Sequence, residues 1–108
     1  MNTRTRRIAG ATILLLALGA CDSGEAASHS ENGRRLAKAW CSGCHSVEST
    51  DQASDAAPTF ASIAKSGGED GAWLRAWLSA PHPAMPDMTL TREEIDDIVA
   101  YLSALKPK

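Results

Sequence analysis

A five-residue run constrains this chain most: Cys41-Ser42-Gly43-Cys44-His45. A C-x-x-C-H pattern is typical of a c-type haem attachment site. At this spacing both thiols reach one porphyrin edge and add to its two vinyl groups as thioethers. The adjacent His45 then lies under the same iron and supplies its proximal nitrogen. The run therefore predicts one haem c per chain, bound covalently through Cys41 and Cys44.

Two other chemistries use a C-x-x-C pattern. A structural zinc site normally needs four protein ligands. Outside the run the chain offers only His29, His82 and Cys21, and none of them sits in a second ligand pair. A thioredoxin-like thiol site belongs next to a βαβ pattern, whereas this chain has almost no strand-like runs. Haem attachment is therefore favoured, and a haem-free zinc or thiol module is the alternative.

The first 20 residues resemble an export signal. Arg4, Arg6 and Arg7 form a basic start, and an apolar run follows over residues 8–20. This run is shorter than the roughly 20 residues that a membrane-spanning helix needs. It fits the apolar region of a signal peptide that is removed from the mature protein.

The end of this signal resembles a bacterial lipobox, Leu18-Gly19-Ala20-Cys21. In such signals the cysteine is lipidated and becomes the first mature residue. We therefore expect a lipid anchor on Cys21 and a location at the periplasmic face of the inner membrane. Ordinary cleavage nearby, giving a soluble periplasmic protein, is the alternative.

The chain then divides into a signal peptide (1–20), a flexible tether (21–30) and one domain (31–108). The tether is inferred from its small, polar and acidic residues. Removal of the signal leaves 8 basic residues against 13 acidic ones, a net charge of −5. A nucleic-acid partner is not expected, because the basic footprint of such proteins is missing.

The hydrophobic periodicity predicts an all-α domain of about four helices around the haem. Helices are expected over residues 31–40, 58–65, 70–79 and from 91 to about 105. Pro58 suits the first position of the second helix. Thr91 and Glu94 form a capping box at the start of the last helix.

A haem iron has a second axial position, and Met85 is the first candidate for it. Pro83 and Pro86 restrict the backbone around Met85. A weak thioether ligand stays bound only where its loop holds it in place, and His/Met ligation raises the reduction potential. Met88 and His82 are competing ligands in the same loop, and His82 would give a bis-histidine haem of lower potential.

Residues around the iron ligands have expected supporting roles. A histidine that binds a metal usually donates its other ring N–H to a carbonyl or carboxylate. The carbonyl of Pro58, in the loop after the run, is a candidate acceptor for His45. Trp73 and Trp77, one helical turn apart, either wall the haem or fill the core.

Together these motifs resemble the class I cytochromes c over about residues 31–105. The ordered motifs are Gly33, the C-x-x-C-H run, Ala57-Pro58-Thr59-Phe60, Met85-Pro86 and Ile98-Val99-Ala100-Tyr101-Leu102. The resemblance implies a cytochrome c fold, with Gly33 and Tyr101 meeting where the first and last helices cross. The chain departs from many members at Ala37, where they have an aromatic residue.

The resemblance also implies outer-sphere electron transfer between redox donor and acceptor proteins, with no small-molecule substrate and no bond-making catalysis. A lipid anchor would favour membrane-bound partners. Two alternatives stay open. The chain could be the haem-bearing subunit of a larger membrane oxidoreductase, or a five-coordinate haem protein that binds a small ligand at its iron.

Overall fold

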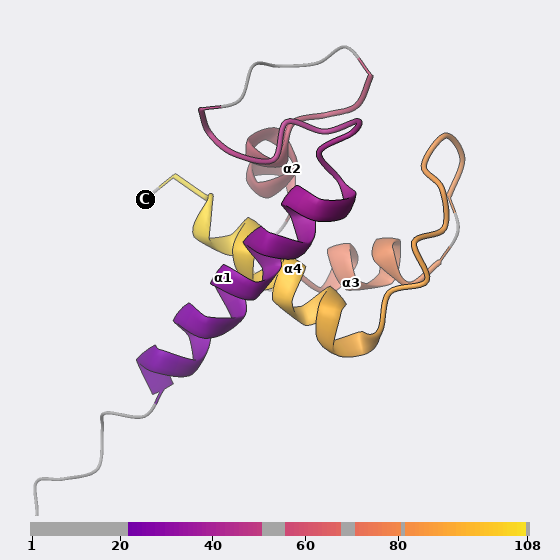
Figure 1. Ribbon diagram of the computed structural model, residues 1–108. Coiled ribbons are helices and arrows are strands. Elements are labelled where there is room, and N and C mark those ends of the chain that lie inside the picture. Colours follow the sequence, from indigo (N-terminus) through magenta and orange to yellow (C-terminus); the bar gives the residue numbers. More distant parts are fainter. Residues whose placement is uncertain (1–21, 51–55, 68–70, 81, 108) are drawn as a thin grey trace, which may run out of the picture.

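The computed structural model describes residues 22–50, 56–67, 71–80 and 82–107. Figure 1 shows four helices, α1 (Asp22–Trp40), α2 (Phe60–Ser66), α3 (Ala72–Leu78) and α4 (Arg92–Ala104). Within the described residues the only extended pairing is an isolated bridge between His82 and Met85. The predicted all-α fold class is therefore confirmed.

The crossing of α1 and α4 forms the centre of the fold (Figure 1). A Cβ atom placed on Gly33 would lie 1.9 Å from the carbonyl oxygen of Asp97 and 2.9 Å from the Cβ of Tyr101. These distances are shorter than any non-bonded contact, so only glycine allows the two helices to approach this closely. The predicted contact between Gly33 and Tyr101 is confirmed. Ala37, one turn further along α1, is fully buried at 0 % exposure.

Helix α1 begins at Asp22, earlier than the sequence predicts. The flexible tether expected over 21–30 is wrong for residues 22–30, which continue the helix. Alanine and glutamate in this segment are good helix formers. His29 is also half-buried, and it forms a hydrogen bond with Asp97 of α4. This long-range contact helps to hold the first part of α1 against α4, in a segment that the amino-acid composition alone predicts to be a linker.

Cys21 and the signal sequence expected over 1–20 lie outside the described residues. In the part of the chain that the structure does describe, no helix is long and apolar enough to cross a bilayer.

Helix α2 begins at Phe60 rather than at Pro58. Thr59 caps it: the side-chain oxygen of Thr59 accepts a hydrogen bond of 3.1 Å from the backbone N–H of Ser62. A threonine cap of this kind satisfies one of the free N–H groups of the first turn. Pro58 therefore lies just outside the helix, and its carbonyl remains available to another partner.

Helix α3 follows Gly71, which has a left-handed φ of 67°. A Cβ at this position would lie 2.5 Å from a methyl group of Val99 on α4. Leu74 is the buried residue of α3. The glycine thus allows the chain to turn sharply and lets the short helix pack against α4.

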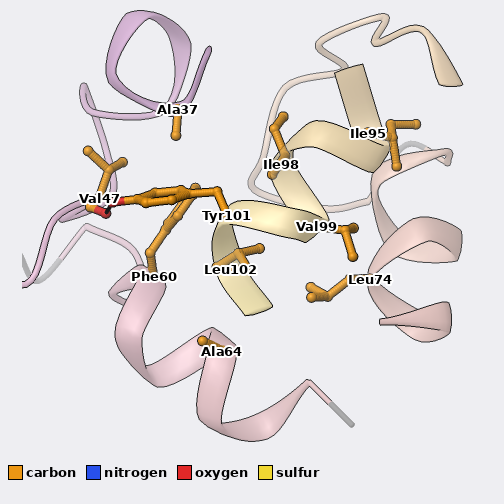
Figure 2. Packing of buried hydrophobic residues seen from close by; sticks show 10 residues of the cluster. All are labelled: Ala37, Val47, Phe60, Ala64, Leu74, Ile95, Ile98, Val99, Tyr101 and Leu102. Atoms are coloured by element: carbon orange, nitrogen blue, oxygen red, sulfur yellow. Dashed lines mark hydrogen bonds between the residues drawn. The ribbon is translucent and has the colours of Figure 1, made fainter. Parts of the chain in front are cut away.

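Helix α4 supplies half of the buried apolar residues of the core. The expected capping box is present, because Glu94 N–H donates to Thr91 Oγ1 (3.2 Å) and Thr91 N–H donates to Glu94 Oε2 (2.8 Å). Figure 2 shows the α4 side chains packing against α1, α2, α3 and the loop after α1. The buried apolar residues are Ala37, Val47, Phe60, Ala64, Leu74, Ile95, Ile98, Val99, Tyr101 and Leu102.

Candidate haem centre

The C-x-x-C-H run forms a turn that continues directly from α1. The N–H of Cys41 donates to the carbonyl of Ala37 (2.9 Å), and those of Cys44 and His45 donate to the carbonyl of Cys41 (3.1 and 2.9 Å). Cys41 is half-buried, Cys44 is exposed, and both are free thiols. Burial raises the pKa of the Cys41 thiol. The turn therefore presents two thiols and one imidazole on a single short segment.

The ring of His45 is oriented by a backbone carbonyl. Its Nδ1 lies 2.6 Å from the carbonyl oxygen of Pro58. A carbonyl can only accept, so Nδ1 carries the proton, and the neutral ring then has its lone pair on Nε2. Phe60 packs edge-on against the imidazole, with ring centroids 5.6 Å apart. This arrangement is typical of a histidine that binds a metal through Nε2.

The backbone after His45 is held by two other elements. The carbonyl of Ser46 accepts a hydrogen bond of 2.9 Å from the N–H of Phe60, at the start of α2. The carbonyl of Val47 accepts a buried hydrogen bond of 2.8 Å from the hydroxyl of Tyr101, on α4. Figure 2 shows the Tyr101 ring reaching across to Val47. The segment that carries His45 is thus tied to both helices.

An ion-pair cluster ties the same segment to α1. Glu48 accepts from Arg34 Nε at 2.7 Å and from Lys38 Nζ at 3.2 Å. Hydrogen bonds from Lys38 and Arg34 lower the pKa of Glu48. Sequence reasoning missed this cluster. Its signal was two basic residues one helical turn apart, with an acid three residues after His45.

The three candidates for the sixth ligand lie together in the loop between α3 and α4. His82, Met85 and Met88 line one small cavity, together with Leu78, Ala80, Pro86, Asp87 and Leu90. His82 Nε2 lies 3.1 Å from the Sδ atom of Met85. Ala84 has a φ of 72°, a left-handed conformation that glycine adopts more easily. The loop thus places its possible iron ligands next to one another.

Three tryptophans are exposed despite their size. The exposed fractions are 45 % for Trp40, 40 % for Trp73 and 51 % for Trp77. Trp73 and Trp77 form an edge-to-face pair with centroids 6.4 Å apart, and Trp77 stacks on His82 at 4.4 Å. These rings do not fill the protein core. Large exposed aromatic surfaces in so small a domain fit an apolar prosthetic group.

The described residues do not form a zinc site. No group of three or more His, Cys, Asp and Glu side chains among them could hold a metal ion. A closed zinc site needs four ligands. Two free thiols and one imidazole with an available nitrogen, all on one turn, instead fit a haem attached through thioethers.

Comparison with known proteins identifies the family. A family model described as cytochrome c matches residues 30–106. The chain belongs to the cytochrome c family. It is 38 % identical over 95 residues to cytochrome c-552 of Bradyrhizobium diazoefficiens, and the match covers 87 % of this chain and 91 % of the relative. No solved structure matches this chain.

Membership of the cytochrome c family decides several expectations at once. The chain is a class I c-type cytochrome, and such proteins carry covalently attached haem c, typically one per chain. Its role is that of a haem electron carrier, and its partners are redox proteins. The predictions of fold class, family and cofactor are thereby confirmed.

Proposed function

We propose that this cytochrome c is a periplasmic electron carrier in which Cys41 and Cys44 hold the haem and His45 and Met85 are the axial ligands. One observation carries the proposal: His45 Nδ1 is hydrogen bonded to the Pro58 carbonyl at 2.6 Å. The bond directs the free Nε2 lone pair away from Pro58, on the same turn as two free thiols.

The bound haem supplies an iron that gains and loses one electron. The residues of the chain set how easily it does so. The Pro58 carbonyl keeps the proton of His45 on Nδ1 and makes the ring a better donor at Nε2. Met85 supplies a neutral, soft sulfur, which favours ferrous iron and raises the reduction potential. The two ligands would therefore help to set the reduction potential at which this carrier accepts and releases its electron.

The proximal side is held rigidly, which suits electron transfer. Ser46, Val47 and Glu48 are bonded to α2, α4 and α1 respectively. A ligand held from three sides shifts little between the two oxidation states, so little reorganisation accompanies each transfer. This mechanism requires both axial positions to be filled and no substrate to bind the metal.

Export and anchoring are inferred from residues 1–21. We propose that residues 1–20 are a signal peptide and that Cys21 carries a lipid anchor, with the domain following directly. Because α1 begins at Asp22, residues 22–30 add a helical spacer of about 1.5 Å per residue. A domain held this close to the inner membrane would meet mainly membrane-bound donors and acceptors.

Optical spectra of the protein made with a haem-attachment system test the axial ligands. The oxidised wild type is expected to be low-spin, with a weak red-edge sulfur-to-iron band that Met85→Ala removes. A high-spin wild type that binds carbon monoxide on reduction, with or without Met85, would contradict the carrier and favour a ligand-binding haem protein. Co-purification with a larger complex after mild detergent extraction would indicate an oxidoreductase subunit.

A further inference from the structure

The loop between α3 and α4 holds a second histidine with the bonding of a metal ligand. The Nδ1 atom of His82 lies 3.0 Å from the carbonyl oxygen of Ala80. The other ring nitrogen faces the Met85 sulfur, and both partners can only accept. The carbonyl oxygen is the stronger acceptor, so the neutral ring carries its proton on Nδ1 and its lone pair on Nε2. This is the same arrangement that the Pro58 carbonyl gives to His45.

That lone pair lies beside the sulfur proposed as the sixth ligand. His82 Nε2 is 3.1 Å from Met85 Sδ, and the backbones of the two residues form an antiparallel bridge. Both side chains line the same small cavity. An iron within reach of the sulfur is therefore within reach of the nitrogen after a small movement of the loop.

The ring of His82 is also held in place. Trp77 of α3 stacks on it, with centroids 4.4 Å apart and planes inclined by 38°. The stacking and the Ala80 carbonyl together fix the direction of Nε2.

We propose that His82 is a second distal ligand, whose Nε2 binds the iron when the Met85 sulfur leaves it. This inference rests on the proposed function, in which Met85 is the resident sixth ligand. Imidazole is a good ligand for iron in either oxidation state, whereas a thioether favours the ferrous state. The exchange keeps the iron six-coordinate, closed to small molecules and at a lower reduction potential.

The test compares three oxidised proteins with attached haem: wild type, Met85→Ala, and Met85→Ala combined with His82→Phe. Phenylalanine keeps an aromatic ring against Trp77 but has no nitrogen to bind iron. Met85→Ala is expected to lose the sulfur band yet stay low-spin, with an electron paramagnetic resonance spectrum of two imidazoles and a lowered reduction potential. The double variant is expected to become high-spin and to bind carbon monoxide after reduction.

The outcomes separate the two proposals. A wild type without the sulfur band contradicts the His45/Met85 carrier. If the band is present and Met85→Ala is as high-spin as the double variant, His82 is not a ligand and the carrier stands. A sulfur band retained in Met85→Ala would assign the sixth ligand to Met88 and overturn both the Met85 and the His82 assignments. If His82 is the replacement ligand, Met85→Ala/Met88→Ala should stay low-spin. Free imidazole should return Met85→Ala/His82→Phe to low spin, which would show that its haem site is intact. If imidazole does not, the spin state of Met85→Ala/His82→Gln decides whether His82 is a ligand.

Discussion

Gly33 is the described glycine at which an added Cβ atom would lie closest to a neighbouring atom. The lack of a side chain at this position is what lets α1 and α4 cross closely. A Cβ there would meet the Asp97 carbonyl at 1.9 Å. Gly33→Ala therefore has to push α1 away from α4, and overpacking of this kind costs about 1–3 kcal/mol. We expect the midpoint of denaturant unfolding to fall accordingly in the oxidised protein with attached haem.

Gly24 provides a matched control in the same helix. A Cβ on Gly24 meets nothing within 4 Å, so Gly24→Ala should leave stability unchanged or raise it by about 0.5–1 kcal/mol through helix propensity. Equal losses in the two variants would show that the α1–α4 crossing does not depend on close approach.

Residue identity alone located most of the candidate site. Cys41, Cys44 and His45 lie at a fixed local spacing, so their pattern is visible without any knowledge of the fold. The bond between His45 and Pro58 was also expected, because a ligating histidine needs such a partner. The restraints on His82 were not, since they depend on how the loop places the Ala80 carbonyl and Trp77 of α3 against the ring.

At the scale of elements, helix ends with local caps were predicted best. The capping box of Thr91 and Glu94 lies within one turn, and its signal is complete in the sequence. The start of α1 was predicted wrongly, because it is supported by a contact between His29 and Asp97, which are far apart in the sequence. The Glu48 cluster with Arg34 and Lys38 joins two segments in the same way.

The contact between His29 and Asp97 makes the docking of α1 on α4 dependent on pH. The hydrogen bond to Asp97 raises the pKa of His29 above 6.5, with smaller contributions from Glu25 and Glu93. A group whose pKa is raised on folding stabilises the protein fully at pH values below its pKa in the unfolded state. This stabilisation is lost as the pH rises through its pKa in the folded state. His29→Gln should therefore destabilise the protein most near pH 5–6 and least near pH 9.

Denaturant unfolding of wild type and His29→Gln across this pH range measures the difference. Glu25→Gln is the control, because it leaves the bond to Asp97 in place and should preserve most of the pH dependence. A difference between wild type and His29→Gln that stays constant from pH 5 to pH 9 would show that the protonated ring does not support the helix.

At the scale of the whole molecule, charge decides which partners can approach. Residues 21–108 carry a net charge of −5, and haem propionates add to it. Several basic side chains are already paired, since Arg34 and Lys38 contact Glu48 and Arg75 contacts Asp96. The long-range field is therefore negative and attracts cationic reactants.

This field predicts opposite salt dependences for two small redox reagents. Electron exchange with the cation hexaammineruthenium should slow as salt is added, because screening removes an attraction. Exchange with the anion ferricyanide should accelerate, because screening removes a repulsion. Stopped-flow rates at rising ionic strength measure both. If ferricyanide instead slows with salt, the local field at the site of electron exchange is positive despite the net charge, and the natural partners would be expected to present acidic rather than basic surfaces.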